Sequence, residues 1–223
     1  AHLIGEVDRD GVPMTLESLT VDIDLARDRS RRTLRVSIDS PDERLLSAEG
    51  SGTGNPVELN QFSGELQGSL SGAGVSYLAQ WLKWDLTAEG RADFWFAVNG
   101  GRPTAVMQVN LTQIAVTGQT ALNLEQLRVE SMVEGPFDQA SIWIDDASLT
   151  ADDQTFLLPR VHLHRLGQSW QLLTNRFEVS PLIAALRGSE LLPDKVNEIL
   201  ETLSPAGAVD RLALTVEALD QPL

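Results

Sequence analysis

The sequence predicts a mostly β protein with two short helices near the C-terminus. Hydrophobic and polar residues alternate repeatedly through residues 1–165, and clusters of turn-forming residues separate the alternating runs. After residue 179 the hydrophobic residues recur at helical spacing instead. The 223 residues are therefore expected to form one unit, with an antiparallel sheet over residues 1–179, a helical insertion over 180–206 and the start of a further strand region over 207–223.

The first alternating runs predict a hairpin with one hydrophobic face. They flank a charged turn at residues 27–32, and residues two apart in a strand point to the same side. The hydrophobic positions are Leu19, Val21, Ile23 and Leu25 before the turn and Leu34, Val36 and Ile38 after it. The Gly/Ser-rich residues 50–54 that follow are interpreted as a flexible turn.

Glycines mark the next predicted strand, which contains Leu66 and Leu70. Because glycine weakens a flat strand interior, those at positions 64, 68, 72 and 74 predict bulges or curvature. Residues 75–84 fit a short amphipathic helix with Leu78, Trp81 and Leu82 on one side.

The longest alternating stretch predicts a second hairpin around a turn at residues 99–103. Phe94, Phe96 and Val98 share one face with Trp95 opposite, and after the turn the same face is continued by Ala105, Met107, Val109 and Leu111. Further alternating segments lie at residues 122–129, 140–144, 156–163 and 169–173.

The tail predicts two helices and a final strand. Ser180 and Pro181 favour the start of a helix over residues 181–186 that ends before Gly188. Residues 193–203 show helical spacing and are stopped by the Ser-Pro-Ala-Gly sequence at 204–207. A strand then restarts at Val209, Leu212, Leu214 and Val216.

Charge and composition exclude several classes of function. With 17 basic and 32 acidic residues the net charge is -15, which opposes nucleic-acid phosphates. The absence of cysteine excludes disulfides and thiolate metal sites. The sequence begins without Met and enters a strand almost at once, so we expect it to be a piece of a longer polypeptide.

No catalytic or metal-binding constellation emerges, and no cofactor is predicted. His162 and His164 point the same way in a strand, but no third ligand has a telling spacing, so we interpret them as polar-face residues opposite Val161 and Leu163. The pairs at residues 145–146 and 152–153 are interpreted as solvated acids that bracket a turn. Residues 68–72 place Leu70 where a nucleophile elbow needs serine.

Two alternatives stay open at this point. The first is a compact β-sandwich that binds glycan or protein through acidic loops and tryptophans, since an indole ring stacks on sugars although strand tryptophans more often pack in a core. The tryptophans are Trp81, Trp84, Trp95, Trp143 and Trp170. The second is a hydrolase that uses His162, His164 and nearby aspartates.

Several segments together resemble the periplasmic middle region of YhdP-type proteins, which belong to the AsmA-like superfamily of the Gram-negative envelope. The resemblance rests on residues 88–96, the Gly-Gly-Arg turn followed by residues 106–111, residues 158–163 before Trp170, and the closing helix, Leu-Pro, helix, Ser-Pro-x-Gly and strand pattern of residues 179–207. It implies a long, curved antiparallel sheet that forms an open hydrophobic groove, in a periplasmic protein anchored in the inner membrane.

The resemblance further implies a non-enzymatic bridge that carries phospholipid between the inner and outer membranes. The family has no catalytic residues, so alternation alone selects the groove-facing, lipid-binding candidates. They are Leu34, Val36, Ile38, Leu66, Leu70, Phe94, Phe96, Val98, Met107, Val109, Leu111, Ile142 and Ile144. The alternative for many of them is packing beneath the helices predicted at residues 181–186 and 193–203.

Overall fold

The computed structural model of the chain is built around one long sheet. The described residues are 2–3, 6–9, 12–15, 19–55, 58, 61–81, 85–117, 122–136, 139–151, 154–167, 169–180, 183, 198–199, 202–203 and 205–217.

The elements whose bounds are described are the helix α1 and a series of strands. They are β1 (His2–Leu3), β2 (Glu6–Arg9), β3 (Val12–Thr15), β4 (Leu19–Asp28), β5 (Arg31–Asp39), β6 (Arg44–Thr53), β7 (Ser63–Ser71), α1 (Gly72–Trp81), β8 (Asp85–Asn99), β9 (Arg102–Thr117), β10 (Leu122–Glu134), β11 (Ser141–Ala151), β12 (Gln154–Leu157), β13 (Val161–Leu166), β14 (Ser169–Thr174), β15 (Phe177–Glu178), β16 (Ala208–Val209) and β17 (Ala213–Glu217).

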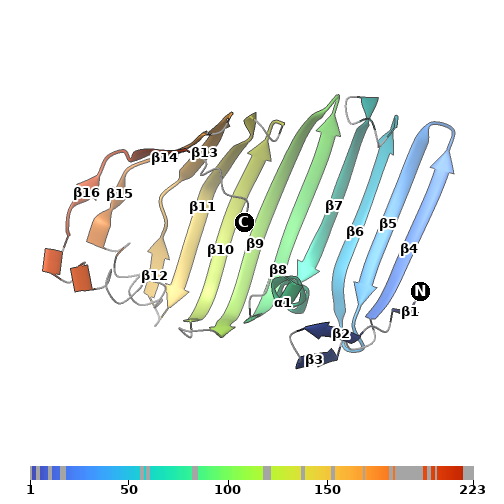
Figure 1. Cartoon of the computed structure of the whole chain (residues 1–223), viewed down its shortest axis with the longest axis horizontal. Coiled ribbons are helices and arrows are strands. Elements are labelled where there is room, and N and C mark those ends of the chain that lie inside the picture. The colour runs from blue at the N-terminus through green and yellow to red at the C-terminus, as the bar shows by residue number, and fades with distance from the viewer. Residues whose placement is uncertain are drawn as a thin grey trace.

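Thirteen strands form the main sheet, and each pairs antiparallel with its neighbours (Figure 1). The strand order is β1, β4, β5, β6, β7, β8, β9, β10, β11, β13, β14 and β17, with β12 paired to β11. The first and last strands of this order do not pair with each other, so the sheet is open rather than closed. This confirms the predicted mostly β fold and its long antiparallel sheet.

The two predicted hairpins are confirmed, but their turns are shorter than the predicted residues 27–32 and 99–103. In the first, Leu25 of β4 pairs with Leu34 of β5 across a two-residue turn at Arg29 and Ser30. In the second, Asn99 pairs with Arg102 across Gly100 and Gly101, whose φ angles are 55° and 80°. A type I′ hairpin turn needs positive φ at both central residues, which glycine adopts without steric cost.

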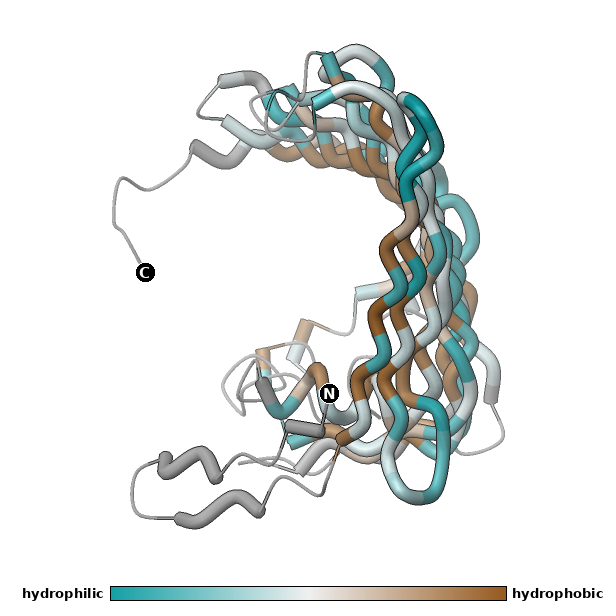
Figure 2. Tube along the Cα trace, turned by 90° about the vertical axis from the view of Figure 1, so that its right-hand side faces the viewer, coloured by the Kyte–Doolittle hydropathy of each residue, from teal (hydrophilic) through white to brown (hydrophobic). Residues whose placement is uncertain are grey.

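The sheet curves strongly along its strands. Figure 2 shows the trace bent into an arc, with hydrophobic positions along its inner side and hydrophilic positions along its outer side. Successive side chains of a strand point to opposite faces, so the alternation of the sequence becomes one hydrophobic and one polar surface.

The flexible turn predicted at residues 50–54 is wrong, because Gly50 and Gly52 lie inside β6. A Cβ atom on Gly50 would lie 2.5 Å from the carbonyl oxygen of Glu65, and one on Gly52 would lie 2.5 Å from the ring of Phe62. The glycines therefore allow close approach within the sheet, and the chain leaves the strand only at Gly54, where φ is 89°.

The turn predicted between the acidic pairs at 145–146 and 152–153 is wrong for residues 147–151, because β11 continues to Ala151. Asp145 and Asp146 lie within this strand, and a register shift opposite Glu130 and Ser131 accommodates the additional residue as a bulge. The second acidic pair, residues 152–153, lies outside the described residues.

The helix content differs from the predicted fold class. The described residues contain a helix in the first half of the chain, α1, which begins three residues before the range predicted at 75–84. Of the two C-terminal segments, Val179, Ser180 and Ile183 and then residues 198–199 and 202–203 are helical, and the remainder of the predicted ranges 181–186 and 193–203 lies outside the described residues. The final segment forms two strands, because β16 pairs with β15 and β17 pairs with β14.

Candidate functional site

One face of the sheet is hydrophobic, and we call it the apolar face. Directly paired residues of antiparallel strands point to the same side, so the register assigns side chains to faces. Three cross-strand rows of this face contain no charged residue from β5 to β11. The rows are Leu34, Gly50, Leu66, Phe96, Ala105, Val133 and Ile142; Val36, Ala48, Gly68, Phe94, Met107, Ser131 and Ile144; and Ile38, Leu46, Leu70, Ala92, Val109, Val129 and Ala147.

All of the candidate residues selected by alternation lie on the apolar face. Leu34, Val36, Ile38, Leu66, Leu70, Phe94, Phe96, Met107, Val109, Ile142 and Ile144 belong to the three rows. Val98 pairs with Gly64 and Pro103 beyond one end of the rows, and Leu111 pairs with Gly90 and Leu127 beyond the other. The alternation therefore predicted correctly which side chains share a face.

Several large hydrophobic side chains of the apolar face are exposed to solvent. The exposed fraction is 39% for Phe96 and 43% for Met107. It rises to 61% for Ile23 and 73% for Leu25 on β4, whose register partners are Val36 and Leu34. This part of the face has no cover within the described residues.

The other end of the apolar face is covered by α1. Leu111 and Ile114 of β9 are each only 4% exposed and form a buried cluster with Leu124, against which Val75 of α1 packs. Leu111 and Ile114 are three residues apart, a spacing that puts side chains on opposite faces of a regular strand. The positive φ of Gln113, 51°, beside a register shift explains why both join one cluster.

Short contacts hold α1 on the sheet. The Ser76 hydroxyl donates a hydrogen bond to the Gly72 carbonyl at 3.0 Å and accepts one from the Ala88 backbone N–H of β8 at 3.1 Å. A Cβ atom on Gly74 would lie 2.2 Å from the Leu45 carbonyl oxygen. Two of the predicted candidates thus differ from the rest: Leu111 is buried under α1, and Val98 is also buried.

The candidate list missed the most exposed part of the apolar face. Ile23 and Leu25 showed the same alternation as the selected residues, and the short turn at residues 29–30 places Leu25 beside Leu34. Leu214 of β17 is likewise on this face, through its pairing with Leu172 of β14. Following the hairpin register outward from Leu34 would have found the first two residues.

The opposite, polar face contains a cavity of about 910 Å³, which we call the polar hollow. Short side chains form its floor, since Ser47 pairs directly with Ser37 and Ser69. Longer side chains surround them. These belong to Asp22, Asp24, Arg35, Arg44, Glu49, Gln67, Arg91, Asp93, Trp95 and Gln108. The hollow needs six strands in register, so no local sequence signal could have found it.

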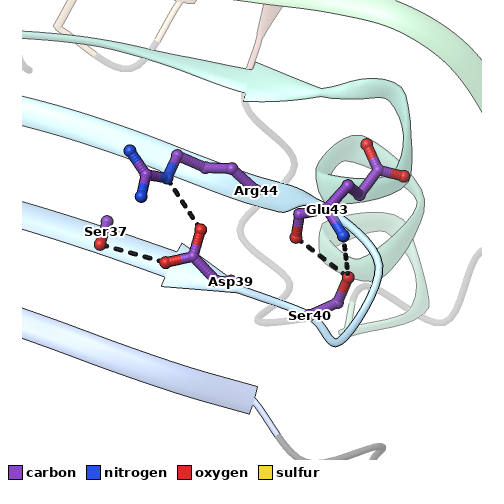
Figure 3. Close-up of polar contacts among 5 residues, drawn as sticks. All are labelled: Ser37, Asp39, Ser40, Glu43 and Arg44. Carbon is purple, nitrogen blue, oxygen red and sulfur yellow. Dashed lines mark hydrogen bonds and ion pairs between the residues drawn. The ribbon is translucent and has the colours of Figure 1, made fainter.

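Hydrogen bonds and ion pairs engage several polar side chains of the polar hollow. Gln67 Nε2 donates to Glu49 Oε1 at 2.9 Å, and Arg91 Nε donates to Asp93 Oδ1 at 2.6 Å. At its edge Arg44 Nε donates to Asp39 Oδ1 at 2.8 Å, beside the Ser40 and Glu43 turn (Figure 3). The hydrogen bond from Arg44 and its positive charge lower the pKa of Asp39, although partial desolvation opposes them.

The two strand histidines lie on the polar face, as predicted. His162 stacks on Trp143 with ring centroids 4.8 Å apart, and His164 Nδ1 lies 2.6 Å from the Ser141 hydroxyl. The buried His162 Nε2 has no hydrogen-bond partner within the described residues. Across those residues no group of three or more His, Asp or Glu side chains is placed to hold a metal ion.

Among the described residues, no helix is long and apolar enough to cross a membrane. Comparisons with protein-family models, with curated proteins and with solved structures find no match.

Proposed function

We propose that the chain is a non-enzymatic segment of a phospholipid conduit, in which the apolar face is the floor of an open hydrophobic groove. In this proposal acyl chains lie along the three uncharged rows while the polar face meets water. The groove is part of a periplasmic bridge of the YhdP and AsmA-like kind, anchored in the inner membrane, that carries phospholipid between the inner and outer membranes.

The observation that supports the proposal most is the exposure of large hydrophobic side chains on the concave side of an unclosed sheet. Fully burying one Leu, Ile, Phe or Met side chain is worth roughly 1.5–3 kcal/mol, so leaving several of them in water is costly unless something apolar covers them. Ile23, Leu25, Phe96 and Met107 are exposed on the same face. A contiguous apolar surface of this kind is typical of an interaction site.

The dimensions suit an acyl chain. Exposing about sixteen methylene groups to water costs on the order of ten kcal/mol. A lipid therefore crosses an aqueous space only when an apolar surface covers its acyl chains. Ten inter-strand steps lead from β4 to β17, which at about 4.8 Å each gives a continuous path of about 48 Å. The rows offer apolar contact without directional polar groups, which lets a bound chain slide.

The test compares the two opposite faces of one strand, β9. Met107→Asp puts a charge in the middle of the apolar face, whereas Asn110→Asp puts the same side chain on the polar face of β9 at an exposed position. Each protein is purified, its co-purifying lipid is measured by native mass spectrometry, and its binding of dansyl-labelled phosphatidylethanolamine is titrated.

Phospholipid should co-purify with the wild type and with Asn110→Asp. Met107→Asp should bind at least about tenfold more weakly, because one charge beside an acyl chain costs more than 1.4 kcal/mol. Equal lipid binding by all three folded proteins, or none by the wild type, contradicts it.

A further inference from the structure

The polar hollow lies on the face that the proposed lipid path does not use. Its floor is the serine trio Ser37, Ser47 and Ser69, and the indole of Trp95 stands at its side on β8, between its register partners Gln67 and Val106. A hollow arises there because short side chains meet in one cross-strand row while long ones occupy the adjacent row. Its volume of about 910 Å³ is within the usual range for small-molecule sites.

The chemistry of the lining favours a neutral, hydroxyl-rich ligand. The hydroxyls of Ser47 and Ser69 can both donate and accept, and Gln67 offers an amide, so the hollow matches groups that do the same. The Ser37 hydroxyl already donates to Asp39 Oδ2 at 3.3 Å but can still accept a hydrogen bond. The lining has three arginines and four acidic residues, which leaves a net charge of only -1 to hold an ion. Arg91 and Asp93 form a short ion pair within it. The net charge of the chain, -15, disfavours anionic ligands further.

Trp95 adds a large apolar surface to the otherwise mainly polar lining of the hollow. It is 36% exposed, although a large aromatic side chain on a polar sheet face gains more by burial. The negative face of an indole ring attracts the weakly positive C–H groups of a sugar ring. Serine hydroxyls and a tryptophan side by side therefore match the two surfaces of a pyranose.

We propose that the polar hollow binds a neutral glycan chain, which hydrogen-bonds to the serine hydroxyls and the Glu49–Gln67 pair and packs against Trp95. The two side chains of that pair are 2.9 Å apart and exposed, so both keep free hydrogen-bonding capacity toward the ligand. This site is independent of lipid binding, because it occupies the opposite face of the same strands.

The experiment titrates the folded chain with three neutral hexasaccharides, namely the β-1,4-linked N-acetylglucosamine hexamer, cellohexaose and maltohexaose, by calorimetry. At least one of them is expected to bind. Trp95→Ala is expected to weaken that binding about tenfold, the effect of losing one aromatic contact of about 1.4 kcal/mol.

A matched pair of variants locates the site. Ser69→Phe fills the floor of the hollow and should abolish binding, whereas Ser63→Phe adds the same ring to the same face of β7 outside it and should not. If no hexasaccharide binds at millimolar concentration, or if binding survives both Trp95→Ala and Ser69→Phe, the proposal is overturned. Met107→Asp leaves glycan binding intact and Trp95→Ala leaves lipid binding intact, so the two proposals fail separately.

Discussion

The two ends of the apolar face carry similar side chains but differ in what covers them. At one end α1 lies on the strands, and Ile114 is 4% exposed within a buried cluster. At the other end Ile23 is 61% exposed on the same sheet. Hydrophobic residues line the strands in both places, so the covering helix decides whether such a residue is core or surface.

The sharpest test of this difference replaces the same residue type at both ends. Ile114→Ala should lower the free energy of unfolding by about 2–5 kcal/mol, because it leaves a cavity under α1. Ile23→Ala should change it by no more than about 0.5 kcal/mol. Urea denaturation followed by circular dichroism measures both. Similar losses for the two variants would mean that the uncovered end is buried in solution.

A second test concerns the packing of aromatic rings over glycine in the uncovered region. A Cβ atom on Gly68 would lie 2.4 Å from the Ser47 carbonyl oxygen and 2.6 Å from the Phe94 ring. Gly68→Ala should therefore cost about 1–3 kcal/mol of unfolding free energy by overpacking, while Ser69→Ala next to it stays within about 0.5 kcal/mol. The midpoints of thermal unfolding of the two variants and the wild type measure this difference. A Gly68→Ala protein as stable as the wild type would contradict the close approach of β6 and β7.

The attachment of α1 gives a smaller effect. Ser76→Ala removes the acceptor of the Ala88 backbone N–H and should cost about 1 kcal/mol, the usual net value of a hydrogen bond. The loss should also speed hydrogen exchange of the Ala88 amide, which mass spectrometry of the exchanged protein follows. Unchanged exchange at Ala88 would show that the helix is held by other contacts alone.

The smallest effect on stability is expected at the ion pair of Asp39 and Arg44, which lies away from both ends of the apolar face. Because the folded-state pKa of Asp39 is below its ordinary value of 3.8, the pair stabilises the fold above that value, and the contribution disappears as the pH falls through the lower folded-state pKa. Asp39→Asn should therefore be slightly less stable than the wild type at pH 7 and equal to it in strong acid. Urea titrations across this pH range test it, and a difference that grows toward low pH would contradict the sign.

The alternation of hydrophobic and polar residues was sufficient to predict the strands and the face that the candidate residues share, because the backbone of a strand fixes its side-chain period. It failed where small residues allow more than one structure. Gly50 and Gly52 fit a loop by composition, yet the carbonyl oxygen of Glu65 and the ring of Phe62 occupy the space that side chains would need.

Features that depend on residues far apart in the chain could not be predicted from the sequence, for a different reason. Whether Leu111 is open or covered depends on α1, and the hollow beside Trp95 depends on the register of six strands. Likewise the acidic pair at residues 145–146 suggested the edge of a turn, whereas it lies at a bulge within β11 that only the register with β10 reveals.

The order of the sheet has a consequence for its cooperativity. From β4 to β11 every strand pairs with the strand next to it in sequence, so its contacts are confined to immediate neighbours. A meander of this kind resembles a one-dimensional array, in which stability is a sum of adjacent interfaces and opening starts at the outermost strands. Hairpins can then be inserted or deleted in evolution with the cross-section unchanged and only the length altered.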